Sequence, residues 1–362
     1  MVTERPVSIL DDPARMRSVD NRNMLRLIND LPEQYETALG IGRGFTLEPL
    51  AIKPSLVFLT GIGDSGITGD VVVAAVSDEI SVPIVSDHGG RLPKYVGKDA
   101  LVFVSDYSGR NPVTLRNYRE AKQRGAAVIC VTTGGPLHAA ASIDGTKIIK
   151  IPAGQPARSA IGYLFVPIAV ALERYGLAFG LSEKLSQAIK LVRNAREALR
   201  YEVASPQNEA KQLAQVLRGK LIVVYGASDY RSAVADRWKL QINANSKLAA
   251  ISSLFPDAAD GEISGWELAD KQCKDFAFVF LKDSSDKAEV ARLMNASADL
   301  LGKFQVVEVE VKGSTTLERL LYGLYLGDYV SCYLALLHEV NPTETRNVTY
   351  VETATAGATP VA

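Results

Sequence analysis

Short apolar runs that end in glycine or a hydroxyl residue alternate with helical periodicities along most of the chain. Ser55–Leu59, for example, leads into Gly61, and Leu101–Val104 leads into Ser105. Buried parallel strands joined by helices produce this alternation, so the pattern predicts an α/β fold. The strand-like runs are Ser55–Leu59, Val82–Val85, Leu101–Val104, Ala126–Val131, Leu221–Tyr225, Phe276–Leu281 and Val306–Val311.

A weak internal repeat suggests that the chain contains two copies of one lobe. Both Leu56–Gly66 and Ile222–Ser232 read as a strand, a glycine turn, a serine and the start of a helix. A helical stretch broken at Pro32 precedes the first copy, and Leu317–Val340 predicts a long helix near the end. We expect an N-terminal helical segment (1–50), a first lobe (51–181), a helical connection (182–217), a second lobe with the C-terminal helix (218–348) and a disordered tail (349–362).

The composition is that of a globular chain able to bury two cores. Of 362 residues, 47% are hydrophobic and 22% charged, and the net charge of −1 gives no overall field that would attract nucleic acid or a membrane. The three cysteines, Cys130, Cys273 and Cys332, lack the spacing of a disulfide framework or a zinc site. We therefore expect a cytoplasmic protein with no metal, no cofactor, and neither nucleic acid nor membrane as partner.

A glycine-rich loop, Gly61–Gly66, is the first candidate for chemistry. It reads G-x-G-x-x-G after a strand, and Asp87 follows about 20 residues later, as in a dinucleotide-binding fingerprint. Glycines and a helix N-terminus suit many anions, and a plain turn without a ligand is also open. The hydroxyl-rich loop Ser105–Gly109 favours a phosphate monoester, because hydroxyls and backbone amides can surround its three terminal oxygens.

Seven motifs in order make the chain resemble the SIS (sugar isomerase) fold, specifically the bifunctional phosphoglucose/phosphomannose isomerases and a diverged, TobH-like branch of that group. The resemblance covers about residues 50–350. It implies two SIS-type doubly wound lobes with mainly parallel sheets and helical N-terminal and C-terminal segments. It also implies a homodimer whose site draws on both subunits, and a sugar phosphate or related small anion as ligand. The motifs are Gly61–Gly66, Asp106–Gly109, Thr132–Gly135, Pro156–Ala160, Asn243–Lys247, Phe255–Trp266 and Asn341–Thr345.

The phosphate-binding positions of the resembled family carry over unevenly. Asp64 replaces a glycine of the first loop, and Asp106 replaces a serine of the second. Such carboxylates either repel a phosphate, by about 4 kcal/mol for a unit pair about 4 Å apart at a dielectric near 20, or cap helices and point away. The residues predicted to bind phosphate or sugar are Gly63, Ser65, Ser108, Asn111 and Lys247.

The catalytic positions depart further from the family pattern. Ala244 stands where the resembled family has the glutamate base, and an alanine cannot accept a proton. Asp260 replaces the ring-opening histidine, while the neighbouring Glu262 is kept. Arg158 matches the arginine that stabilises the enediolate, and Thr345 matches a threonine that assists ring opening.

Three hypotheses follow. The leading one is a catalytically degenerate SIS protein that binds a sugar phosphate or acts as a regulatory partner in sugar-phosphate metabolism. The second is an active glucose-6-phosphate/mannose-6-phosphate aldose–ketose isomerase with a rewired base, for which Glu262 and Asp260 are the candidates. The third is a nucleotide-binding protein that uses Gly61–Gly66.

Overall fold

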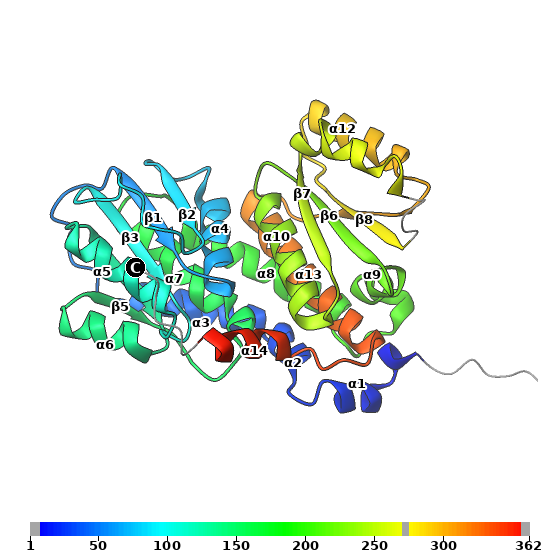
Figure 1. Ribbon diagram of the computed structural model, residues 1–362, viewed down its shortest axis with the longest axis horizontal. Helices are drawn as coiled ribbons and strands as arrows, with labels where there is room; N and C mark the ends of the chain where they lie inside the picture. Colours follow the sequence, from blue (N-terminus) through cyan, green and yellow to red (C-terminus); the bar gives the residue numbers. More distant parts are fainter. Residues whose placement is uncertain (1–7, 270–274, 356–362) are drawn as a thin grey trace, which may run out of the picture.

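Two lobes, each built on a parallel sheet, lie side by side in the computed structural model, which describes residues 8–269 and 275–355 (Figure 1). The first sheet has the strand order β2-β1-β3-β4-β5, and every neighbouring pair is parallel. This confirms the predicted α/β fold. Its strands are β1 (Leu56–Thr60), β2 (Ile84–Asp87), β3 (Ala100–Ser105), β4 (Ala127–Thr132) and β5 (Lys147–Lys150).

The second sheet repeats the start of the first, with the parallel order β7-β6-β8-β9. In both sheets the first strand lies between the second and the third, so the chain reverses its direction of winding at β1/β3 and at β6/β8. The edge strands β5 and β7 were not predicted, because β5 is short and half-exposed and β7 is interrupted by two serines. The strands are β6 (Leu221–Ala227), β7 (Ala250–Phe255), β8 (Phe276–Lys282) and β9 (Gln305–Glu310).

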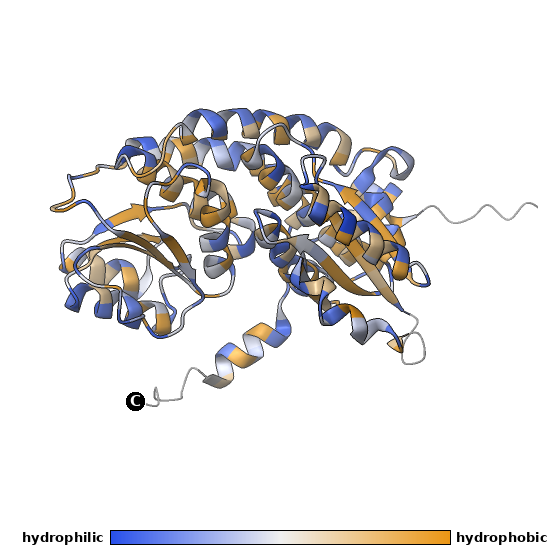
Figure 2. Cartoon of the chain, turned by 90° about the horizontal axis from the view of Figure 1, so that it is seen from above, coloured by the Kyte–Doolittle hydropathy of each residue, from blue (hydrophilic) through white to orange (hydrophobic). Residues whose placement is uncertain are grey.

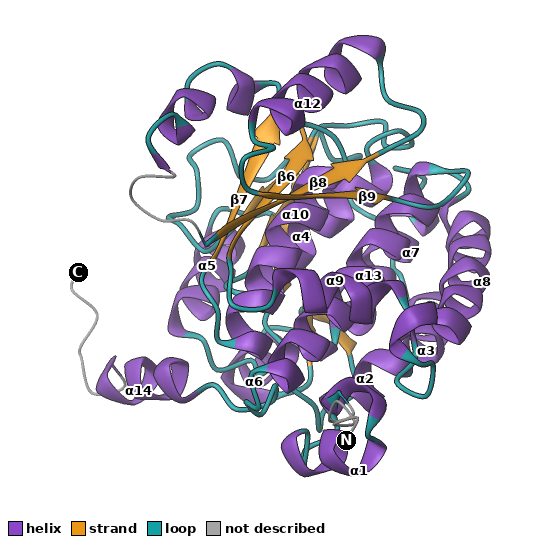
Figure 3. Ribbon diagram, turned by 90° about the vertical axis from the view of Figure 1, so that its right-hand side faces the viewer, coloured by secondary structure: helices purple, strands orange, loops and turns teal. Residues whose placement is uncertain are grey.

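Helices cover both faces of each sheet, as the alternating side chains of the strands require. On β1, Val57 and Leu59 face an inner core that continues into the second lobe, whereas Phe58 faces a separate outer core. Figure 3 shows α12 on one side of the second sheet and α10 on the other. The inner helices are α4 (Asp64–Val76), α7 (Ile161–Arg174), α10 (Arg231–Gln241) and α13 (Thr316–Leu337); the outer ones are α5 (Pro112–Gln123), α6 (Gly135–Ile143) and α12 (Ala288–Leu300).

The remaining helices brace the junction of the lobes. Pro32 lies in the first turn of α3, just after α2 ends, so the predicted break is confirmed. Gln34 of α3 accepts the N–H of Gly162 and donates to the carbonyl of Ser159, each at 2.8 Å. These bonds fix the turn that carries Arg158. The helices are α1 (Pro13–Val19), α2 (Met24–Asn29), α3 (Leu31–Gly44), α8 (Leu181–Leu199) and α9 (Glu209–Leu217).

The long helix α13 is buried at every residue from Leu320 to its end at Leu337. It meets the length and composition of a membrane span, but core helices of soluble proteins meet the same test when they are buried, as α13 is. The tail was expected to be disordered from residue 349, and this is wrong as far as Thr355, because α14 (Arg346–Thr355) is helical. The hydroxyls of Thr349 and Thr353 bond to carbonyls one turn back. Figure 2 shows α14 extending from the body, and residues 356–362 lie outside the described residues, as does Cys273.

Candidate active site

Two loops of the first lobe lie at the switch point between β1 and β3, where the sequence predicts a phosphate site. Gly63 caps the N-terminus of α4 with a φ of +56°, a conformation that favours glycine. Ser65 is buried, and its hydroxyl accepts a hydrogen bond from the backbone N–H of Tyr107 at 3.2 Å. That bond ties the first loop, Gly61–Gly66, to the loop after β3.

Asp106 closes the second loop on itself. Its carboxylate accepts the N–H of Gly109 at 2.9 Å and the N–H of Asn111 at 2.8 Å. The hydroxyl of Ser108 donates to the same carboxylate at 3.1 Å, while the side chain of Asn111 accepts two N–H groups and caps α5. Asp106 therefore caps no helix; its carboxylate points into its own loop and accepts three of that loop's donors.

Asp64 lies in a different environment. It occupies the first turn of α4 but makes no capping hydrogen bond. Burial raises the pKa of its carboxyl group, and the positive charges of Arg237 and Arg158 act in the opposite direction. The first loop thus carries an acid within electrostatic reach of Arg158, at a position where the resembled family has glycine.

Arg158 lies at the junction of the lobes, in a 3-10 turn, with only 6% of its surface exposed. Its Nε donates to Asn245 Oδ1 at 2.7 Å. Its Nη2 donates to the carbonyls of Pro342 and Thr343 at 2.7 and 2.8 Å. Burial lowers the pKa of the guanidinium group, and the nearby carboxyl group of Asp64 acts in the opposite direction.

Lys247 follows a π-helical turn, Ile242–Ser246, in a left-handed conformation with a φ of +59°. Its Nζ donates to the carbonyls of Ala244 and Pro342 at 2.7 and 3.3 Å. Because Arg158 Nη2 donates to the same Pro342 carbonyl, the two cations lie within about 6 Å, where unit charges repel by about 3 kcal/mol at a dielectric of 20. Burial and the charge of Arg158 lower the pKa of Lys247 to about 8. We call Arg158 and Lys247 the cation pair; neither forms an ion pair with a described residue.

A cavity of about 970 Å³ opens beside the cation pair, between the π-helical turn, the N-terminal helices and the segment that leads into α14. Ala244, Lys247 and Thr345 line it, so the structure brings these three predicted positions together. Glu344 also lines the cavity and forms an ion pair with Arg346 at 3.2 Å. The two loops of the first lobe do not reach this wall.

The two acids proposed as a replacement base lie elsewhere in the chain. Glu262 accepts a hydrogen bond from the hydroxyl of Tyr225 at 2.7 Å, and its other oxygen accepts the hydroxyl of Ser253. Tyr225 belongs to the aromatic core on the outer face of the second sheet. The cation pair contacts the π-helical turn and the segment at Pro342 instead, so no hydrogen bond or ion pair of the described residues within one chain joins Glu262, or Asp260 two residues before it, to Arg158.

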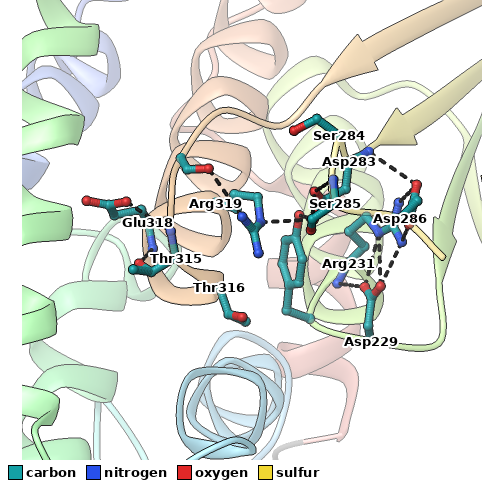
Figure 4. A network of polar contacts seen from close by, with 12 residues as sticks. Asp229, Arg231, Asp283, Ser284, Ser285, Asp286, Thr315, Thr316, Glu318 and Arg319 are labelled. Carbon is teal, nitrogen blue, oxygen red and sulfur yellow. Dashed lines mark hydrogen bonds and ion pairs between the residues drawn. The ribbon is translucent and has the colours of Figure 1, made fainter.

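Ion pairs fill the corresponding edge of the second lobe, at the β6/β8 switch point (Figure 4). Arg231 is 1% exposed and pairs with Asp229 and Asp286. Arg319 of α13 pairs with Asp283 at 2.9 Å. The second copy of the loop therefore neutralises its cations with carboxylates of its own, and a cavity of about 1000 Å³ lies beside them.

Three features that hold the cation pair were missed by sequence reasoning. The side chain of Asn245 lies inside the quoted motif Asn243–Lys247, which was a usable signal. Asp328, which pairs with Arg237 at 2.8 Å, was signalled by its place in an apolar helix. The carbonyl of Pro342 reaches Arg158 across 184 residues and leaves no trace in the sequence.

Comparison with known proteins places the chain among phosphosugar isomerases. Residues 206–353 match the bacterial phospho-glucose isomerase C-terminal SIS domain. The bifunctional phosphoglucose/phosphomannose isomerase of Caldicellulosiruptor bescii is 35% identical over 327 residues, or 90% of this chain and 96% of that protein. The enzyme of the same name from Aquifex aeolicus is 31% identical over 88% of this chain and 97% of its own.

Solved structures share the fold. A hypothetical protein from Thermus thermophilus superimposes with a TM-score of 0.73 and 17% identity, covering 96% of this chain and 94% of its own. At that identity the likeness shows the fold alone, whereas the identity to the two enzymes extends over nearly whole chains. The chain therefore belongs to the family of bifunctional phosphoglucose/phosphomannose isomerases.

Proposed function

We propose that this protein does not isomerise sugar phosphates, and that it binds a sugar phosphate or acts as a regulatory partner in sugar-phosphate metabolism. The observation that carries this proposal is Ala244. It lines the cavity beside the cation pair, at the position where the resembled family has the carboxylate that moves the proton. A methyl group offers no acceptor for that proton.

The rewired isomerase finds less support in the geometry. Both oxygens of Glu262 accept hydrogen bonds from the outer core of the second lobe, and a general base must lie within hydrogen-bond reach of the substrate proton. The nucleotide hypothesis gains no support from Asp87, since one oxygen of its carboxylate already accepts hydrogen bonds from Thr60 and Gly89.

We further propose a cytoplasmic homodimer. The protruding helix α14 presents exposed apolar side chains at Val348, Tyr350 and Val351, and clustered exposed apolar residues favour an interface. Light scattering on the purified protein tests this proposal, and a stable monomer at micromolar concentration would contradict it.

The test of function is a coupled assay that follows conversion of fructose 6-phosphate into glucose 6-phosphate or mannose 6-phosphate. The wild type is compared with Ala244→Glu, and Ala198→Glu, on the exposed side of α8, is the matched control for the added charge. We expect no turnover in the wild type or the control, together with measurable binding of glucose 6-phosphate by calorimetry. Clear wild-type turnover would refute the proposal. Turnover gained only by Ala244→Glu would show a competent pocket that lacks its base.

A further inference from the structure

A groove of about 1000 Å³ lies between the two lobes, beside the ion pairs of Figure 4. One wall is formed by α4 and β2 of the first lobe, and the other by the β6/β8 switch point, the end of β7 and the start of α13. In Figure 1, β2 and β7 lie on the sides of their lobes that face each other. Among the described residues, none lines both this groove and the cavity beside the cation pair, so the two are separate.

The outer side of β2 is a free strand edge in this groove. β2 pairs with β1 along its other side. The backbone N–H of Gly61 donates to the carbonyl of Asp87, so Asp87 directs its backbone groups towards β1. Successive residues of a strand direct these groups to opposite sides, so the N–H and C=O groups of Ile84 and Ser86 point away from β1. Both residues line the groove, where another strand can pair with them.

The two strand edges at this groove lack the charges that protect the other two. The outer edge strand β5 carries Lys147 and Lys150, and the outer edge strand β9 carries Glu308 and Glu310. Charges on an edge strand oppose pairing with another chain. β2 has no charged residue before its last, Asp87, and β7 has none. The facing lobe keeps a second sheet away from these edges, whereas a groove of this volume admits a single extended segment.

The groove is acidic, which narrows the chemistry of its occupant. Six carboxylates and three cations line it. Two of the cations, Arg231 and Arg319, form ion pairs with carboxylates of the switch-point loops, as Figure 4 shows. The excess of carboxylates favours a positively charged partner and repels an anion. The carboxylates are Asp70, Asp78, Asp229, Asp236, Asp283 and Asp286, and the third cation is Lys287.

Two of these acids, Asp70 and Asp78, give the groove a spacing. Both belong to α4, where their positions lie about 12 Å apart along the helix axis. Residues i and i+4 of a strand lie on one face, about 13 Å apart. α4 packs closely on one face of β2, since a Cβ atom at Gly69 would meet Ser86 Oγ at 2.5 Å, so a strand added to β2 passes beside α4. Asp70 pairs with His88 at 2.7 Å, whereas Asp78 is exposed.

From the free edge, the acidic walls and this spacing, we infer that the groove binds an extended, basic segment of a partner protein, which adds to the first sheet as a strand beside β2. Lysine or arginine residues at positions i and i+4 of the segment face Asp70 and Asp78. Main-chain hydrogen bonds to Ile84 and Ser86 hold the segment, and its alternate side chains provide selectivity. This interaction goes beyond the proposed function and is independent of it, because the two cavities are separate.

The experiment follows the fluorescence anisotropy of a labelled peptide, Thr-Lys-Val-Thr-Val-Lys-Thr, during titration with the full chain. The same peptide with glutamate in place of both lysines is the charge control. Two further versions carry N-methyl groups at either the odd or the even positions. Because the N–H groups of a strand alternate in side, one N-methylated version should lose binding and the other should keep it.

We expect the lysine peptide to bind with a dissociation constant below about 1 mM. Asp78→Lys and a raised salt concentration should each weaken this binding about tenfold. Asp299→Lys, at an exposed acid near the end of α12, is the matched control and should leave binding unchanged.

Three results would overturn the inference. Absence of binding by the lysine peptide at about 1 mM would show that the groove does not take such a segment. Equal binding of the glutamate peptide, or an unchanged affinity in Asp78→Lys, would show that the acidic wall does not select the partner. Retained binding by both N-methylated versions would show that no strand is added to β2, and this test uses the unaltered protein, so it does not depend on the folding of a variant.

Discussion

The ion pair between Arg237 and Asp328 supports the most quantitative prediction. Both side chains are at most 2% exposed, and the guanidinium meets the carboxylate through two hydrogen bonds of 3.0 and 2.8 Å. Gln241 adds a third at 2.8 Å. Removing one partner of such a pair leaves a buried charge uncompensated, which costs about 3–5 kcal/mol. Against a total stability of about 5–15 kcal/mol, Asp328→Asn should therefore lose a large share of the free energy of unfolding.

Chemical denaturation monitored by tryptophan fluorescence measures this loss, because Trp238 of α10 is buried and directly follows Arg237 in the sequence. The double variant Arg237→Met/Asp328→Leu should recover most of the stability, because an apolar pair of similar volume leaves no charge to solvate. A loss below about 1 kcal/mol in Asp328→Asn would refute the reasoning, because it would mean that water or relaxation already screens the pair.

Three further predictions concern single residues. Gly109→Ala should destabilise the protein by about 2 kcal/mol or more in denaturant titrations, because φ is +66° and a Cβ atom would approach the carbonyl oxygen of Gly134 to 1.9 Å. Thr315→Ala removes half of the capping box of α13 and should cost about 1 kcal/mol in the same measurement. Lys247→Met should raise the melting temperature of the ligand-free protein below pH 8. The folded state there holds a proton at an unfavourable site, and the advantage should shrink as the pH rises from 8 towards the unfolded pKa near 10.5, so an equal difference at all pH values would contradict it.

The sheets were predictable to the extent that their strands are buried on both faces. β3 is buried at every residue, and its apolar run Leu101–Val104 identifies it directly. β5 and β7 lie at sheet edges, where one side is free of a neighbouring strand and the apolar run is short or broken by serine. The pattern of hydrophobic residues reflects which side chains are buried, so it does not identify strands that are only partly buried.

The site was predictable in its residue types and unpredictable in their directions. The sequence contains Asp106 but does not indicate the three loop donors that its carboxylate accepts, so it could not show that this side chain bonds within its own loop instead of capping a helix. Glu262 illustrates the reverse case. It lies in a motif of the resembled family, yet its hydrogen-bond partner Tyr225 is a strand residue that faces the outer core. The alternation of side chains along a strand does not indicate which of the two cores adjoins the site.

The cation pair argues against simple decay of an ancestral site. Arg158 is buried and Lys247, although exposed, lies within about 6 Å of it, so the two like charges repel each other and a neutral residue at position 247 would be favoured if stability alone mattered. The cost is explained if a ligand supplies the missing negative charge, since strain of this kind is typical of binding sites. The loss of the acid at 244 then has a second meaning: it removes the base for proton transfer and also leaves the cations free for an anion. On this reasoning, stabilisation of the ligand-free protein and loss of ligand binding should appear together in Lys247→Met.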